Sequence, residues 1–268
     1  MAKDVRAPIA YVKSEGKRPY YYANAHEKDY VPLAPVEMAI EDVRGTATSL
    51  DEEGFVLVDH KSAIEDWADR ERVAARHPAE IVELMKRHTG ADAVVVTGGG
   101  ILRYSERSGQ AGSSDNSYPA RFAHVDMSRE AAAAARAQAE PQGRTPVRSA
   151  QYNVWRAVSG PPQDVPLALC DWRSVRGPEL LEAEAIFDPP GGAPEWRFAS
   201  YVVAHDPGHR WCYFPDMRPD EAIIFKSSES DPDRAQLMPH VAFDNPLAGP
   251  DAPPRVSIEM RCTAYWYG

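Results

Sequence analysis

The stretch Val147-Arg-Ser-Ala-Gln-Tyr-Asn-Val-Trp-Arg-Ala-Val158 opens a half of the chain in which β-strand patterns dominate. It is rich in β-branched and aromatic residues, which favour strands, and a proline and a glycine stand close to its two ends. Similar runs follow, separated by Pro, Gly or Asp, over residues 167–171, 196–205, 210–214, 221–226, 240–243 and 255–267. Short strands punctuated in this way indicate an all-β sandwich or barrel.

The helices that the sequence predicts lie before residue 147. The clearest one covers residues 78–88, with Pro78 in its first turn and Gly90 as a stop signal after its end. Residues 62–76 predict a further helix or two. Residues 128–139, with a run of alanines and a serine cap, predict another.

The rest of this first part predicts short strands and loops. Strands are expected at residues 54–58, 93–97 and 122–126, and the glycine run 98–100 is interpreted as a turn. Residues 105–118 are rich in Ser, Gly, Asp and Asn, which indicates a loop that is either disordered or an active-site lid. The expected fold class is an all-β core with a helical N-terminal flank, arranged as a jelly roll. We expect one domain over residues 1–268, with a mixed α/β flank at 1–100 and the jelly-roll core at 101–268.

Composition excludes several classes of function. The 268 residues are 43% hydrophobic and 26% charged, as in globular proteins rather than disordered ones. The net charge of -10 disfavours nucleic acid and anionic membranes as partners, and no stretch approaches the roughly 20 apolar residues of a membrane span. A small molecule is the expected partner. Three scattered cysteines, Cys170, Cys212 and Cys262, predict buried free thiols and a cytoplasmic location.

The segment Phe122-Ala-His-Val-Asp-Met127 holds the first candidate metal ligands. On a strand, His124 and Asp126 point to the same face, so both can bind one metal ion. The geometry that leaves positions open for substrate and dioxygen is the two-histidine, one-carboxylate triad of non-haem iron, which requires a second histidine from elsewhere. The candidates are His205, His209 and His240. The segment His205-Asp-Pro-Gly-His209 is well explained as a turn between two strands, which favours His240.

The residues after His240 predict a site for a carboxylate. Arg255 follows on a strand, with Ser257 on the same face two residues later, and the guanidinium fork of arginine suits a carboxylate. Oxygenases that use 2-oxoglutarate need such a cation for the far carboxylate of this cosubstrate. Arg261 shares the strand face and remains a competitor for the role. Arg103 and Arg156 stay open as contacts of the cosubstrate or the substrate.

These residues, taken together, resemble a known family of Fe(II)- and 2-oxoglutarate-dependent oxygenases. Its members include cephamycin methoxylase-type, gibberellin desaturase-like and aspergillic-acid hydroxylase-like proteins. The resemblance spans nearly the whole chain and rests on motifs such as Asp51-Glu-Glu-Gly-Phe55, Phe122-Ala-His-Val-Asp-Met-Ser128, Tyr152-Asn-Val-Trp-Arg156, Trp211-Cys-Tyr-Phe-Pro-Asp-Met217 and Pro239-His-Val-Ala-Phe-Asp244. The chain departs from the family pattern at Cys212, where an aromatic residue is expected, and at Ala157, where proline is common.

The resemblance implies a double-stranded β-helix, which is a cupin-like jelly roll, and the cofactors Fe(II), 2-oxoglutarate and dioxygen. It implies a tailoring oxidation in specialised metabolism, such as hydroxylation, desaturation or ring closure. His124, Asp126 and His240 are the expected metal-binding catalytic residues, and Arg255 and Ser257 are expected to hold 2-oxoglutarate. Two other hypotheses are a cupin-like metal-binding protein without redox turnover and an iron oxidase that does not use 2-oxoglutarate.

Overall fold

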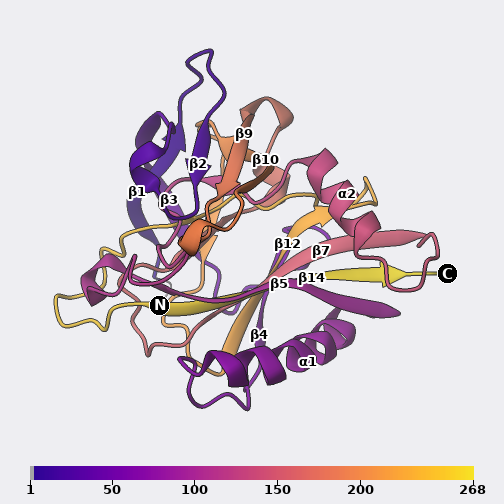
Figure 1. Ribbon diagram of the computed structural model, residues 1–268. Helices are drawn as coiled ribbons and strands as arrows, with labels where there is room; N and C mark the ends of the chain where they lie inside the picture. The colour runs from indigo at the N-terminus through magenta and orange to yellow at the C-terminus, as the bar shows by residue number, and fades with distance from the viewer. Residues whose placement is uncertain (1–2) are drawn as a thin grey trace.

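The computed structural model describes residues 3–268 as two β-sheets that face each other, with a long helix on the outside (Figure 1). The nine-stranded sheet has the order β1 (Val5–Val12), β3 (Leu33–Asp42), β11 (Trp211–Tyr213), β8 (Leu167–Cys170), β13 (His240–Ala242), β6 (His124–Val125), β10 (Trp196–Val203), β9 (Leu180–Phe187) and β2 (Tyr20–Tyr22). The five-stranded sheet has the order β4 (Phe55–Asp59), β12 (Glu221–Glu229), β7 (Arg148–Ala157), β14 (Val256–Trp266) and β5 (Ala93–Tyr104). Most neighbouring strands are antiparallel, which confirms the expected all-β jelly roll.

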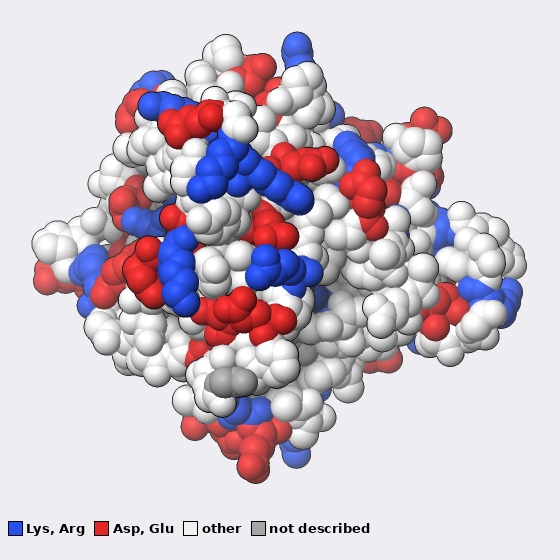
Figure 2. Space-filling view, turned by 45° about the horizontal axis from the view of Figure 1, so that its top comes forward, with Lys and Arg blue, Asp and Glu red and all other residues white. Residues whose placement is uncertain are grey.

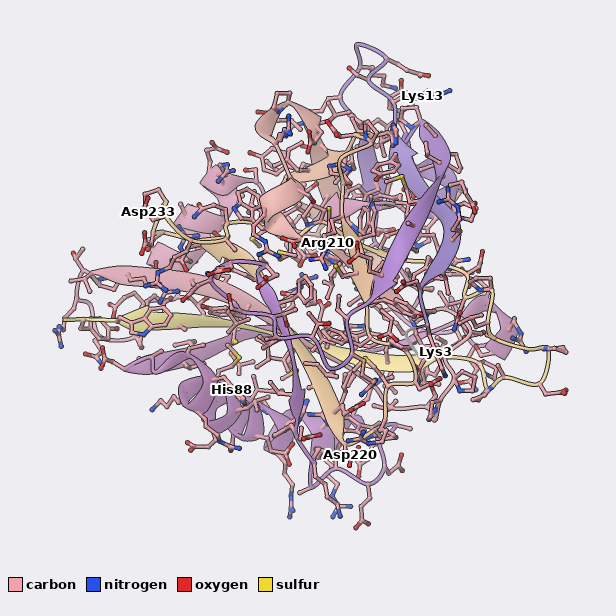
Figure 3. All side chains as sticks on the ribbon, turned by 180° about the vertical axis from the view of Figure 1, so that it is seen from behind. Lys3, Lys13, His88, Arg210, Asp220 and Asp233 are labelled. Carbon is pink, nitrogen blue, oxygen red and sulfur yellow. The ribbon has the colours of Figure 1, made fainter. Side chains whose placement is uncertain are left out.

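The space between the sheets holds one part of the core, and the outer face of the five-stranded sheet holds another. Alternation along β7 explains this division, because successive side chains point to opposite faces. Trp155 packs inward with residues of β8 and β11. Tyr152 and Val154 face outward, where they contact the helix α1 (Arg70–Thr89). Seen from behind in Figure 3, side chains fill the interior and His88 marks the end of α1.

The two helices differ from the prediction at the start of the first one and agree with it at Gly90 and Ser128. α1 begins at residue 70 with Asp69 as its cap, so Pro78 lies inside the helix and not in its first turn. The helix continues through this proline because Val73 and Ile81, on either side of it, are both buried. Gly90 ends α1 in the left-handed conformation, as expected, with φ of 65°. The second helix, α2 (Arg129–Gln138), is capped by Ser128, whose side chain accepts a hydrogen bond from the backbone N–H of Ala131.

Several strands were not predicted. The sequences of β1, β3 and β9 do not alternate strictly between apolar and polar residues, because each contains consecutive small or apolar residues, although buried and exposed positions do alternate at the start of β1. The interpretation of residues 98–100 as a turn is wrong, because β5 runs through all three glycines. Gly99 adopts φ of +111° at a bulge, and a Cβ atom there would lie 2.3 Å from the carbonyl oxygen of Glu259. Residues before 101 contribute strands to both sheets. We therefore keep the proposal of a single domain over residues 1–268.

Short 3-10 turns connect the strands at η1 (His26–Lys28), η2 (Glu106–Ser108), η3 (Trp172–Ser174), η4 (Gly177–Glu179) and η5 (Pro190–Gly192). Cys170, Cys212 and Cys262 are buried free thiols, which confirms that prediction. In the part of the chain that the structure describes, neither helix combines the length and the apolar character needed to cross a membrane. Figure 2 shows acidic and basic side chains interspersed over one face, without a broad patch of either sign.

Candidate metal centre

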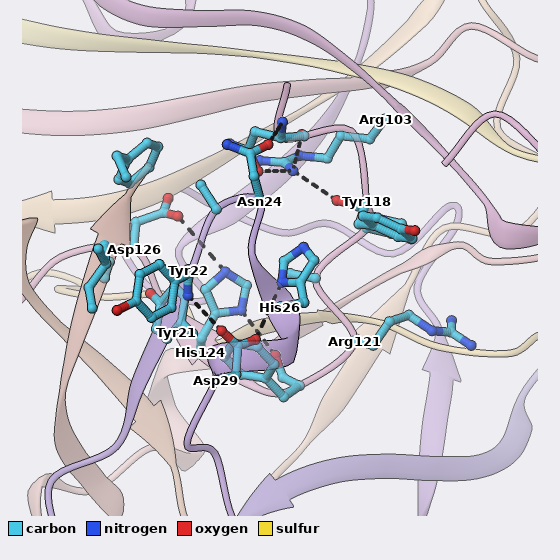
Figure 4. A pocket seen from close by; sticks show the side chains of 18 of the residues that line it. Tyr21, Tyr22, Asn24, His26, Asp29, Arg103, Tyr118, Arg121, His124 and Asp126 are labelled. Atoms are coloured by element: carbon cyan, nitrogen blue, oxygen red, sulfur yellow. Dashed lines mark hydrogen bonds and ion pairs between the residues drawn. The ribbon is translucent and has the colours of Figure 1, made fainter. Parts of the chain in front are cut away.

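Two neighbouring strands of the nine-stranded sheet bring the predicted metal ligands together. His124 on β6 and His240 on β13 stand directly opposite each other, and their ring centroids lie 4.3 Å apart. Asp126 follows β6 and points to the same side as His124, at 3.9 Å from Nε2 of that histidine (Figure 4). One ligand atom from each of the three residues lies within 4.8 Å of the other two. All three side chains are buried, so the cluster is a formed site rather than a chance surface grouping.

Backbone carbonyls fix the orientation of both imidazoles. Nδ1 of His124 lies 3.0 Å from the carbonyl oxygen of Phe122, and Nδ1 of His240 lies 2.9 Å from that of Met238. A carbonyl oxygen only accepts hydrogen bonds, so Nδ1 carries the proton on each ring. The lone pair of each Nε2 is therefore free for a metal ion, which is the usual arrangement of metal-binding histidines.

The carboxylate of Asp126 is held from two sides. Asn153 on β7 donates from Nδ2 to Oδ2 at 2.6 Å, and Arg261 on β14 donates from Nη2 to Oδ1 at 3.0 Å. Asn153 and Arg261 are direct cross-strand partners, which is why both reach the same carboxylate. Sequence reasoning missed this role of Asn153; the two-residue period of a strand puts it on the same face as Trp155, but does not show that this face meets Asp126.

Electrostatics keep the three ligands in the form that binds a metal. Burial lowers the pKa of His124 to about 3, and it also lowers the pKa of His240. Burial alone would raise the pKa of Asp126, but Arg261 and the neighbouring histidines outweigh burial and hold this pKa well below its usual range. At neutral pH the site therefore offers two neutral imidazoles and one ionised carboxylate, without a proton to displace.

A small cavity of about 40 Å³ adjoins the three ligands, and Arg255 lies in its wall. Arg255 is 1% exposed and forms no salt bridge with any residue of 3–268. Its Nη1 donates to the carbonyl oxygen of Val165 at 2.9 Å, while its Nε has no partner in this part of the chain. The hydroxyl of Ser257, two residues along β14, is also buried without a partner. Burial lowers the pKa of Arg255 to about 9, so the guanidinium is still charged at neutral pH.

These residues fit the cofactors that the sequence analysis implied. Two imidazole nitrogens and one carboxylate oxygen are the donor set of non-haem Fe(II) sites, so these residues would hold such an ion. A buried, unpaired guanidinium is costly unless an anion accompanies it. The cavity at Arg255 therefore suits the carboxylate of a small acid that also binds the metal.

The competing residues have other partners. Arg261 lines the same cavity, but it pairs with Asp126 and with Glu259. His209 is buried between the hydroxyl of Tyr11 at 3.0 Å and the carboxylate of Glu179 at 2.8 Å, and it is not part of the His-Asp-His cluster. Arg156 lies on the outer face of β7, where it donates to the carbonyl oxygens of His60 and Pro219.

Two larger cavities open onto the ligands. The first, which we call the metal-side cavity, has a volume of about 540 Å³ and aromatic walls that include Tyr21, Phe122 and Phe198 (Figure 4). The second, which we call the β5 groove, has a volume of about 690 Å³ and runs along β5 and β14. Asp126 and Arg261 line both.

A polar bridge lies between the two cavities and includes the loop 105–118, for which the sequence indicates either disorder or an active-site lid. Arg103 donates to the carbonyl oxygens of Asn116 and Tyr118, and the backbone N–H of Asn116 donates to the side chain of Asn24. Asn24 also donates to Asp115. The loop 105–118 is thus bonded across the site to the segment that follows β2.

Comparisons with known proteins identify relatives of this chain. A family model described as an oxidoreductase/YMDC permease-like domain matches residues 9–265. The chain is 32% identical to the alpha-ketoglutarate-dependent dioxygenase phiK of a fungal species over 230 residues, which cover 83% of this chain and 81% of phiK. It is 32% identical to the hydroxylase/desaturase CTB9 of Cercospora beticola over 238 residues, which cover 81% of this chain and 72% of CTB9. The solved structure of the iron and alpha-ketoglutarate-dependent endoperoxidase NvfI superposes with a TM-score of 0.83 at 22% identity, over 99% of this chain and 98% of NvfI.

Proposed function

This chain belongs to the Fe(II)- and 2-oxoglutarate-dependent dioxygenases, and from that premise we propose that His124, Asp126 and His240 bind the iron. We also propose that Arg255 and Ser257 bind the far carboxylate of 2-oxoglutarate. The enzyme is an oxidoreductase that performs a tailoring oxidation of a small molecule. When bound, the iron and 2-oxoglutarate activate dioxygen and supply the oxidant. The residues of the chain bind and orient the reactants, and they exclude water from the site.

One observation carries the assignment of the cosubstrate site. The unpaired guanidinium of Arg255 and the three candidate iron ligands line the same small cavity. A dicarboxylic keto acid has one end that chelates a metal and another that needs a cation, so one molecule satisfies both parts of this cavity. The two rival hypotheses, a cupin-like protein without redox turnover and an iron oxidase without 2-oxoglutarate, leave this buried charge unexplained and are not favoured.

The finer features of the reaction are part of the proposal. We propose hydroxylation, desaturation or oxidative cyclisation of an organic metabolite; CTB9 is itself a hydroxylase/desaturase. The net charge of -10 supports a small-molecule partner rather than nucleic acid or an anionic membrane. Three buried free thiols support action in the reducing cytoplasm.

The iron ligands are tested by anaerobic reconstitution with Fe(II), followed by measurement of iron per chain. His240→Ala is expected to abolish retention of iron, because it removes one of three donors. His205→Ala, the same change at an exposed histidine, is the matched control and is expected to retain iron as the wild type does. Full iron content in His240→Ala, with loss in His205→Ala, contradicts the assignment.

Arg255 is tested in the same reconstituted protein. Arg255→Gln is expected to retain iron but to raise the Kd for 2-oxoglutarate at least 100-fold, because the far carboxylate loses its cation. Arg156→Gln, at a buried arginine on the outer face of β7, is the control and is expected to leave this Kd unchanged. An unchanged Kd in Arg255→Gln contradicts the assignment of the cosubstrate cavity.

A further inference from the structure

Gly98 has no evident reason, within the protein, to be a glycine. It lies inside β5, its φ is not in the left-handed region, and a Cβ atom added there would meet nothing within 4 Å. Gly99 and Gly100 differ, because both adopt positive φ values that favour glycine. A glycine inside a strand weakens the strand and often marks a place where another molecule approaches closely. The backbone conformation at position 98 thus does not require glycine, and the lack of a side chain leaves the space beside the strand open.

The strand register shows where that space lies. Gly98 on β5 pairs with Arg261 on β14, and Arg261 pairs with Asn153 on β7. Residues directly opposite each other in antiparallel strands project to the same face of the sheet. The side chains of Arg261 and Asn153 both reach Asp126, so a side chain at position 98 would project from that same face, into the β5 groove that Gly98 lines.

The other wall of the β5 groove is aromatic. Phe187 and Trp196 stack with centroids 4.1 Å apart and an interplanar angle of 16°, and Phe198 packs beside both rings. Phe187 on β9 and Trp196 on β10 are direct cross-strand partners, Phe198 lies two residues further along β10, and all three line the groove. Trp196 is 52% exposed, so its ring is accessible to a ligand in the groove. The groove therefore offers flat aromatic rings on one side and a bare strand on the other.

The groove continues to the metal centre. Asp126 and Arg261 line both the groove and the metal-side cavity, so a molecule in the groove reaches the proposed iron ligand without leaving the protein. Arg261 bonds Glu259 through Nε and Asp126 through Nη2, and its Nη1 makes no hydrogen bond with residues 3–268. That Nη1 is available for an oxygen atom of a ligand at the junction of the two cavities.

We propose that the β5 groove binds a planar, apolar ring system of the substrate, and that Gly98 determines specificity by leaving room for it. This inference rests on the proposed function and names the substrate class: a molecule with fused flat rings and an oxygen atom near the carbon that is oxidised. The rings stack on Trp196 and Phe198, and the oxygen accepts a hydrogen bond from Arg261.

The test uses 2-naphthol, which has two fused rings and one hydroxyl, with the enzyme loaded with Fe(II) and 2-oxoglutarate under argon. Binding is followed by naphthol fluorescence. Gly98→Val is expected to raise the Kd for 2-naphthol at least 10-fold, since the valine side chain fills the groove. Gly160→Val is the matched control, because Gly160 also has an ordinary φ and open space around it but lies outside the groove, and it is expected to bind as the wild type does. Trp196→Ala is expected to weaken binding to a similar extent as Gly98→Val.

Two further measurements separate this inference from the proposed function. The absorption band of iron-bound 2-oxoglutarate is expected to be unchanged in Gly98→Val, because the cavity at Arg255 does not include position 98. A missing band in the wild type contradicts the proposed function, whereas a normal band with equal 2-naphthol binding in all variants, or with no binding at all, overturns the groove. Sedimentation of the wild type as a dimer that Trp196→Ala dissociates also overturns it, because the aromatic wall is then a subunit contact.

Discussion

The imidazoles of His124 and His240 and the carboxylate of Asp126 are oriented before any metal arrives. Each histidine uses Nδ1 for a backbone carbonyl, and Asn153 and Arg261 hold the two oxygens of Asp126. Such outer contacts fix the geometry of the ligands and are costly to remove. At the scale of single residues, the site therefore depends on partners of the ligands as well as on the ligands.

Asn153→Leu is expected to weaken the binding of Fe(II) about 10- to 100-fold, because Asp126 loses one of the two groups that orient it. Thr263→Val is the control: Thr263 is a buried residue of the neighbouring strand β14, its hydroxyl has no partner in residues 3–268, and it is expected to leave Fe(II) binding unchanged. Anaerobic titration gives both values. Equal affinities in the two variants contradict the role assigned to Asn153.

Arg255 is expected to reduce stability when 2-oxoglutarate is absent. Arg255→Met is similar in size and removes a buried charge without a salt-bridge partner, so it is expected to raise the free energy of unfolding by about 1–2 kcal/mol. Arg103→Met is expected to lower this free energy, because Arg103 bonds two backbone carbonyls. Urea titrations without the cosubstrate measure both changes. A less stable Arg255→Met protein would contradict this expectation, because the hydrogen bond of Arg255 to Val165 and its contact with the Trp155 ring would then outweigh the cost of the buried charge.

At the scale of elements, the strands position the site and α1 supports the sheet behind it. The helix packs Ile81, Leu84 and Met85 against the outer face of β7, β12 and β14. Its proline is an internal weakness, because Pro78 lacks the N–H that a helix interior uses.

Pro78→Ala is expected to raise the free energy of unfolding by about 1–3 kcal/mol, because alanine restores the missing hydrogen bond and favours helix. The same change at Pro250, which is exposed in a loop, is expected to have little effect. Urea unfolding of both variants tests this expectation. A destabilised Pro78→Ala protein would show that the proline relieves strain in α1.

The end of β4 predicts a dependence of stability on pH. Burial, with the nearby charge of Arg156, lowers the pKa of His60 to about 4. The unfolded chain takes up this proton at a higher pH than the folded protein does, so stability is full above about pH 6.5 and falls as the pH drops towards 4. Between pH 7.5 and 5, the free energy of unfolding is expected to fall by about 1 kcal/mol less in His60→Gln than in the wild type. This value allows for solvent screening, because His60 is half-buried. Urea titrations at the two pH values measure this change. The control His205→Gln, at an exposed histidine, is expected to lose as much stability as the wild type. If His60→Gln also loses as much stability as the wild type, the account is contradicted.

The same elements show what sequence reasoning captures. The two-residue period of a strand predicts that His124 and Asp126 share a face, and that Arg255 and Ser257 do. The capping residues Ser128 and Gly90 mark helix ends because their effect is local. In contrast, the contact of Asn153 with Asp126 depends on the register of three strands far apart in the chain, which no local pattern encodes.

At the scale of the whole molecule, two sheets enclose one continuous site. Arg255 and the proposed iron ligands line the innermost cavity, and Asp126 and Arg261 also line the metal-side cavity and the β5 groove. The jelly roll provides this depth because its strands cross between two facing sheets. Under the proposed assignment, 2-oxoglutarate lies in the innermost cavity and the organic substrate in the outer cavities.

The central claim is that one cavity binds iron and 2-oxoglutarate together. The most direct test is an anaerobic titration of the metal-free protein with Fe(II) and then with 2-oxoglutarate, followed by visible absorption. We predict a charge-transfer band that appears only after the keto acid is added, is absent in Asp126→Ala and is weakened in Arg255→Ala. Iron binding without such a band would contradict the claim, and the 2-oxoglutarate-independent hypotheses would then replace it.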